Sequence, residues 1–167
     1  MSYANDEPVD EILEAARLVP ALEWILTGEP PEAVRAAAPP NVTFAGFVSD
    51  SEYERLIRSV AGVCALTTRA HTMQRAGYEA FNFGVPQVTS DFSELRDFYG
   101  ESALYTASDA EAIAAAARSL ADRREELRRR VLELRPQRIA EQRRALARLT
   151  LMLHGSGSRD LAHGKGA

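Results

Sequence analysis

Cysteine is almost absent from this sequence of 167 residues, and the single one present, Cys64, excludes two kinds of structure. One cysteine cannot form a disulfide within the chain, and it cannot build a cysteine-based metal cluster. Because Cys64 lies in the apolar run of residues 62–66, we predict a buried and chemically inert thiol. The sequence gives no reason to expect a metal site.

Long apolar runs are lacking as well. No stretch approaches the length needed to cross a bilayer, and the N-terminus has no charged segment followed by an apolar run of the kind that directs secretion. We therefore expect a cytoplasmic protein. With 46% apolar and 26% charged residues, the composition is typical of one globular domain that can bury its own core.

A glycine-rich turn of the form G-x-G-x-x-G follows none of the expected strands, which argues against a dinucleotide-dependent oxidoreductase.

Basic residues are scarce in one part of the chain: residues 1–117 carry 7 Arg and 18 acids, whereas residues 118–148 carry 11 Arg and 5 acids. The basic segment could contact phosphates. It lacks interleaved aromatics, however, and Leu127, Val131 and Leu134 recur at helical core spacing, so a solvated helix face is favoured over nucleic-acid binding.

Periodicity and turn residues predict helices that alternate with short apolar strands. Pro8 opens the first helix, and Gly84 and Pro136 are expected to terminate two later ones. The expected helices are residues 8–19, 51–58, 73–83, 108–120, a segment ending near 134, and 137–153. The expected strands are residues 22–27, 42–47, 63–66, 85–89 and 104–105.

This alternation predicts an α/β fold, a Rossmann-like, doubly wound parallel sheet with helices on both faces and further helices at the C-terminus. In such a sheet the ligand site lies at the carboxyl ends of the strands. These ends fall at residues 27–30, 47–50, 67–74 and 89–92. We therefore expect functional side chains in these four segments.

The segment from Thr67 to Gln74 is the richest of the four, because it joins a buried strand to a helix and contains hydroxyls, an arginine, an imidazole and an amide. Free backbone N–H groups at a helix N-terminus attract anions, so the loop could hold a diphosphate, with Arg69 or His71 adding charge-assisted hydrogen bonds. From physical chemistry alone, the alternative is that the threonines cap the helix and Arg69 is solvated.

Residues 79–90 read E-A-F-N-F-G-V-P-Q-V-T-S. This run resembles the E-A-x-x-x-G-x-P-x-V-x-S signature of the large retaining glycosyltransferase family that uses nucleotide-activated sugars (glycosyl transferases group 1). The resemblance extends over residues 6–135, because the second strand, the third strand and the helix after them follow the family's order. It implies the C-terminal, donor-binding domain of a two-domain GT-B glycosyltransferase.

The resemblance also implies roles for individual residues. Glu79 matches the second of two family glutamates eight positions apart and would contact the ribose hydroxyls, while the first, beside the sugar ring, is replaced by His71. The loop is similar to that of a subgroup of the family with T-T-R-x-H-T-M-Q at this point. This similarity implies that His71 is the subgroup's alternative to the first glutamate and occupies the catalytic position. The other donor-binding residues implied are Arg69, Thr72, Met73 and Gln74 in the loop, with Phe47 and Val48 for the base.

The family commonly places an arginine and a lysine after its first strand to neutralise the diphosphate, and residues 3–8 contain no matching cation. By position, the nearest substitutes are Arg69, His71 and Arg75, of which Arg69 is favoured and Arg75 is expected to face solvent. The nucleotide sugar is the substrate, and neither a cofactor nor a metal is expected.

Two parts of the family pattern lie outside the match. The donor domain's central first strand would be finishing at residues 1–4, so we expect a sheet without its middle strand and with unpaired edges that favour a homodimer or a partner chain. Without the acceptor-binding N-terminal domain, the chain alone is expected not to transfer sugar, and a membrane-bound acceptor would be reached through a full-length protein.

The alternative to a glycosyltransferase is a degenerate, non-catalytic module of the same fold that acts by binding partners. We expect one domain over residues 1–154 and a disordered tail over 155–167.

Overall fold

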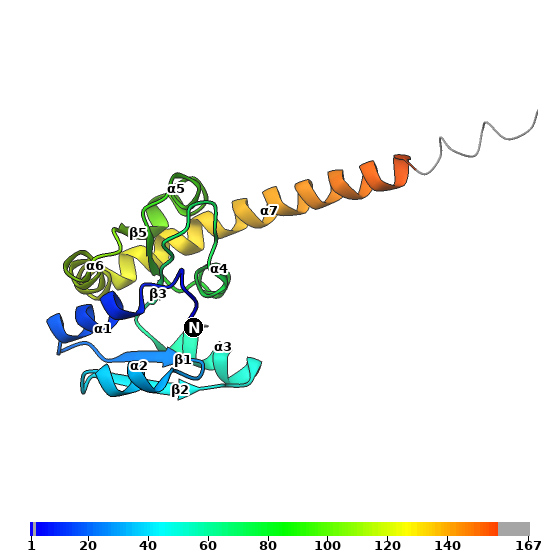
Figure 1. Cartoon of the computed structure of the whole chain (residues 1–167). Helices are drawn as coiled ribbons and strands as arrows, with labels where there is room; N and C mark the ends of the chain where they lie inside the picture. Colours follow the sequence, from blue (N-terminus) through cyan, green and yellow to red (C-terminus); the bar gives the residue numbers. More distant parts are fainter. Residues whose placement is uncertain (2, 157–167) are drawn as a thin grey trace, which may run out of the picture.

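The computed structural model describes Met1 and residues 3–156, with side chains as far as residue 153. Helices and parallel strands alternate along the chain (Figure 1). The helices are α1 (Val9–Leu18), α2 (Glu32–Ala37), α3 (Asp50–Ser59), α4 (Arg75–Phe83), α5 (Ser93–Tyr99), α6 (Ala110–Asp122) and α7 (Arg124–Ser156), with a short 3-10 turn, η1 (Gly100–Ser102). The strands are β1 (Trp24–Thr27), β2 (Val42–Gly46), β3 (Val63–Ala65), β4 (Gln87–Ser90) and β5 (Ala103–Thr106). The part of the predicted tail from residue 157 onward lies outside the described residues.

The strands form two parallel sheets, β1–β2 and β3–β4–β5, flanked by helices as expected for a Rossmann-like fold. In the second sheet, Val63 and Ala103 both pair with Gln87, which places β4 in the centre. Among the described residues no strand joins β1 to β3, in agreement with the expected gap. The amino group of Met1 donates to the carbonyl oxygen of Thr27 at 3.0 Å, so the start of the chain lies at the end of β1.

Three clusters of buried apolar side chains hold the helices against the strands. The largest joins α1, α6 and the start of α7 to β4, and Val88 of β4 is fully buried within it. A second cluster joins α4, α5 and α7 around Phe81 and Tyr99, whose rings meet edge to face. A third packs Ile57 of α3 against α4. Burial raises the pKa of Cys64, beside the first cluster, to about 12, so its thiol stays protonated at neutral pH.

The C-terminal helix differs from the prediction, because Pro136 lies inside α7 and does not end it. Proline removes a backbone N–H and crowds the preceding turn, but here contacts on both sides of it hold the helix to the body. Arg135 donates to the carbonyl oxygen of Asn82 at 3.0 Å, and Arg138 donates to that of Phe98 at 2.8 Å. The two helices predicted around Pro136 are therefore one, and its distal half projects from the body (Figure 1).

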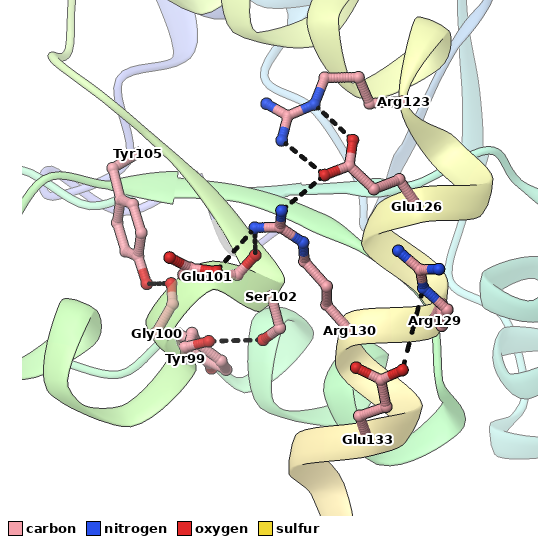
Figure 2. Close-up of polar contacts among 10 residues, drawn as sticks. All are labelled: Tyr99, Gly100, Glu101, Ser102, Tyr105, Arg123, Glu126, Arg129, Arg130 and Glu133. Atoms are coloured by element: carbon pink, nitrogen blue, oxygen red, sulfur yellow. Dashed lines mark hydrogen bonds and ion pairs between the residues drawn. The ribbon is translucent and has the colours of Figure 1, made fainter.

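Arginines just before α7 and in its first turns face carboxylates. Glu126 accepts a hydrogen bond from Arg123 at 3.0 Å and lies 2.7 Å from Arg130, which also contacts Glu101 at 3.1 Å (Figure 2). Ion pairs this exposed to solvent add little to the stability of the fold. The basic segment is thus a solvated helix face that its own acids partly neutralise. No described helix has the length and apolar character that crossing a bilayer requires.

Two short helices, α2 and α5, were not predicted. Each is too short to show apolar periodicity, and α2 buries none of its residues. The α5 helix follows β4 directly and is anchored by Leu95 and Tyr99, both buried. Its position matters for the site, because its first turn lies beside the loop that precedes α4.

Candidate functional site

The loop of residues 66–74 leaves the sheet at the carboxyl end of β3, and the Ser90 hydroxyl at the end of β4 fixes this point. The hydroxyl oxygen accepts a hydrogen bond from the Thr67 backbone N–H at 2.8 Å and donates to the Thr67 carbonyl oxygen at 2.7 Å. Both residues are buried. A side chain therefore extends the pairing of β3 with β4 beyond Ala65 and sets where the loop begins.

Asp6 holds both ends of the same loop. Its carbonyl oxygen accepts from the Thr68 backbone N–H at 2.8 Å. Its carboxylate accepts from the Thr67 hydroxyl at 3.3 Å and from the Gln74 side-chain amide at 3.5 Å. The family pattern has cations near residues 3–8, where this chain has Asp6. Asp6 supplies hydrogen-bond acceptors that shape the loop and no positive charge for a diphosphate, a role that the sequence did not indicate.

His71 lies in the middle of the loop, in a left-handed backbone conformation with φ 59°. Its backbone N–H donates to Glu94 Oε1 on α5, and its ring Nδ1 lies 2.9 Å from the same oxygen. The imidazole is 87% exposed and thus accessible to a ligand. Sequence reasoning missed Glu94, although it follows the strand end at residues 89–92 by only two positions.

The carboxylate of Glu94 is held from several sides. The hydrogen bond from its own backbone N–H, followed by those from the Ser93 hydroxyl and the His71 backbone N–H, lowers the pKa of Glu94 from its ordinary value of 4.5. The Ser93 hydroxyl donates to Oε2 at 2.9 Å. Glu94 is therefore ionised at neutral pH.

The two carboxylate oxygens of Glu79, on α4, have different surroundings. Oε1 accepts from Arg75 Nε, one turn earlier, at 2.7 Å. Oε2 is buried and receives no hydrogen bond of regular geometry among the described residues, although the Tyr53 hydroxyl interacts with this carboxylate; the side chain as a whole is 22% exposed. A buried oxygen without a donor is costly, because it has lost water and gained nothing in exchange. This arrangement can accept a hydroxyl group from a ligand that enters beside α4.

Tyr53 connects Glu79 to α3. Burial, followed by the negative charge of Glu79 and a hydrogen bond to its carboxylate, raises the pKa of Tyr53 to about 12, so the phenol stays protonated and can donate at neutral pH. The α3 helix begins just after Phe47 and Val48, the residues predicted to recognise a base, and Phe47 is 87% exposed. No local pattern in the sequence indicates that Tyr53 lies beside Glu79.

The other predicted residues lie on the surface of the loop. Arg69 is exposed, and its guanidinium makes no hydrogen bond or ion pair within the described part of the chain. The Thr72 hydroxyl donates to the Ala70 carbonyl oxygen at 3.4 Å, and the Met73 side chain is exposed. The N-cap of α4 is Gln74, which makes no side-chain capping bond, so the first N–H groups of α4 are not taken by a threonine cap. Arg75 is exposed, as expected, and also pairs with Glu79.

Two shallow grooves lie elsewhere on the protein. One, of about 450 Å³, is lined by acidic side chains of α1, including Asp10 and Glu14. The other, of about 270 Å³, lies between the end of α1 and Arg118. Neither contains a predicted site residue. Within the described residues no three His, Cys, Asp or Glu side chains are grouped so that they could hold a metal ion.

Comparison with known proteins gives a family and a fold. The model of the family described as "Glycosyl transferases group 1" matches residues 1–123. A crystal structure of a putative UDP-N-acetylglucosamine 2-epimerase from Listeria monocytogenes is similar with a TM-score of 0.59 and 17% sequence identity. That similarity covers 78% of this chain and 38% of the other, so the present chain corresponds to well under half of that structure. No curated protein matches.

Proposed function

Because the chain belongs to the glycosyl transferases group 1 family, we propose that it forms the nucleotide-sugar-binding part of a glycosyltransferase. In this proposal a sugar is transferred, with retention of its anomeric configuration, from a nucleotide-diphosphate donor to an acceptor held by another domain. The protein contributes by positioning the donor and by stabilising the charge of the diphosphate that leaves. The isolated chain binds the donor and does not complete the transfer.

The observation that carries this proposal is the unpartnered Oε2 of Glu79. A vicinal diol, such as the two hydroxyls of a ribose, donates two hydrogen bonds in one plane, which suits a carboxylate. Oε1 accepts from one of them by sharing or exchanging its bond to Arg75, which is exposed and easily moved, and Oε2 accepts from the other once the side chain turns this buried oxygen toward the ligand. Tyr53 supplies a further donor on the same side.

The diphosphate is assigned to the loop before α4. The N-terminus of α4 has no side-chain cap, and its backbone N–H groups and helix dipole favour an anion. Arg69 is the one predicted cation of the loop whose side chain makes no bond to a described residue, whereas His71 and Arg75 each contact a carboxylate. The similar epimerase structure is named for a UDP-linked sugar, which makes uridine diphosphate the first nucleotide to test.

Calorimetric titration of the chain with uridine, guanosine and adenosine diphosphates tests the site. We expect at least one to bind with millimolar affinity or better. Glu79→Ala should weaken that binding by more than about tenfold, because hydrogen bonds to a charged group contribute about 1.5–3 kcal/mol each. In a complete enzyme, His71→Ala should reduce turnover more than nucleotide affinity.

The matched control is Glu125→Ala, which removes a carboxylate that is 81% exposed on α7. It should leave nucleotide binding unchanged. Equal affinity of Glu79→Ala and wild-type protein would remove Glu79 from the site and with it the basis of the proposal.

A second candidate is a non-catalytic module of the same fold. It is favoured by Asp6, which contributes acceptors where the family commonly has cations, and by the two sheets, which no described strand joins. This module would bind none of the diphosphates and would assemble with itself or a partner through its open sheet edges, which sedimentation velocity would detect.

A further inference from the structure

We infer that Glu94 is the positioning residue for His71: it fixes the proton on Nδ1 of the imidazole and leaves Nε2 as the free ring nitrogen. What Nε2 then does rests on the proposed function. The placement of the proton does not, and it can be tested separately.

The contact between the two residues decides the tautomer. Glu94 Oε1 lies 2.9 Å from His71 Nδ1. An unprotonated ring nitrogen and an ionised carboxylate oxygen would both present lone pairs at this distance and repel each other, so the proton lies on Nδ1. The hydrogen bond on one ring nitrogen thereby sets the state of the other, and neutral His71 carries an acceptor lone pair on Nε2.

Glu94 is well placed to do this, because it is itself fixed. Its second oxygen accepts from the Ser93 hydroxyl at 2.9 Å. The next residue, Leu95, is buried in the cluster that joins α4, α5 and α7, so the first turn of α5 cannot swing away from the loop without opening the core.

The backbone of His71 gives a second reason. A non-glycine residue at φ 59° has a strained backbone and persists only where its surroundings hold it. Glu94 Oε1 does so by accepting the backbone N–H of His71 in addition to facing Nδ1. One oxygen therefore fixes both the backbone and the ring, which is more than a surface ion pair with free rotation would achieve.

For the proposed function, the pair restores an acceptor at a position where the family pattern has a glutamate. Nε2 accepts a hydrogen bond from a sugar hydroxyl, and the Glu94 carboxylate behind the ring supplies the negative charge that a neutral imidazole lacks. Among the described residues the polar partners of Glu94 are His71, Ser93 and its own backbone N–H, and in this scheme Glu94 does not contact the sugar.

Nitrogen NMR of the histidine rings tests the proton placement in the full chain. The protein has three histidines, so His71→Asn identifies the signals of His71 by difference. At a pH of about 8.5, above the ordinary imidazole pKa of about 6.5, we expect the Nδ1–H tautomer in wild-type protein. Glu94→Ala should shift His71 to the Nε2–H tautomer that predominates in an unrestrained imidazole, whereas Glu94→Gln should keep Nδ1–H because the amide oxygen still accepts.

The control is Glu101→Ala, which removes a carboxylate 88% exposed beside α7 and should leave the His71 signals unchanged. The inference is overturned if wild-type His71 is in the Nε2–H form, or if Glu94→Ala leaves its tautomer unchanged. A backbone amide spectrum like that of the wild type shows that each variant is folded. Nucleotide titration separates the two claims: absence of diphosphate binding contradicts the proposed function, whatever the tautomer.

Discussion

At the scale of single residues, the donors and acceptors of the site are already largely paired within the protein. Asp6 engages Thr67 and Gln74, Glu79 engages Arg75, and Glu94 engages His71. A diphosphate would therefore meet three carboxylates around the loop. If a diphosphate binds as proposed, Arg69 and the first backbone N–H groups of α4 have to outweigh this repulsion, and its affinity should then be sensitive to salt and to neutralisation of these carboxylates.

Ser90 carries a residue-scale prediction about stability. Its hydroxyl serves both the N–H and the carbonyl of Thr67, and both residues are buried. Ser90→Ala should lower the free energy of unfolding by about 1–3 kcal/mol, because two buried backbone groups lose their partner. Urea denaturation followed by circular dichroism measures this.

Ser51→Ala is the matched control for Ser90→Ala, since it removes an exposed hydroxyl at the start of α3. It should change the free energy of unfolding by less than about 0.5 kcal/mol. Similar losses in the two variants would mean that Ser90 does not fix the beginning of the loop.

At the scale of elements, the position of α4 depends on Gly77. A Cβ at this residue would lie 2.3 Å from Gln87 Oε1 of β4 and 3.0 Å from the Cβ of Ala65 of β3. The helix that carries Glu79 therefore packs closely on the sheet at Gly77. A larger residue would displace α4 and with it the site.

Gly77→Ala should destabilise the protein by about 1–3 kcal/mol through overpacking, although alanine favours a helix by up to about 1 kcal/mol. Thermal or urea unfolding measures the net effect. A double-mutant cycle with Gln87→Ala is the control: the cost of Gly77→Ala should shrink when the Gln87 side chain is removed. A stabilising effect in the wild-type background would show that α4 has room to move.

At the scale of the whole molecule, α7 divides into a docked part and a projecting part (Figure 1). The docked part contributes Leu127 and Val131 to the core, and farther along the helix Gln142 accepts a hydrogen bond from the Tyr78 hydroxyl at 3.0 Å. Beyond it, Leu146 and Leu153 are 64% and 76% exposed.

A chain that ends at residue 142 should melt within about 2 °C of the full chain, because removing exposed side chains changes stability by less than about 0.5 kcal/mol. It should also associate less at high concentration, since it lacks the exposed leucines. Differential scanning calorimetry and sedimentation velocity measure the two effects. A chain that ends at residue 134 is the comparison: it loses the contacts of Arg135, Arg138 and Gln142 and should melt at a clearly lower temperature.

Much of the fold could be predicted because it depends on short-range patterns. Gly84 ends α4 in a left-handed conformation, as expected of glycine after a helix. The signature of residues 79–90 indicated glycosyl transferases group 1, the family whose model matches the chain. The site was predicted only in outline. Its residues come from segments far apart in the sequence, and no local pattern indicates that Glu94 lies beside His71 or that Asp6 lies beside Gln74.

The sequence by itself determined the alternation of helices and strands, the loop that carries the chemistry and the family, because periodicity, turn residues and a contiguous signature are local properties. Tertiary structure alone decided that Pro136 stays within a helix, that Glu79 has one paired and one unpaired oxygen, and that a carboxylate from α5 holds His71. The physical reason is the same in each case: hydrogen bonds and burial between distant segments are comparable in energy to local preferences and can override or redirect them.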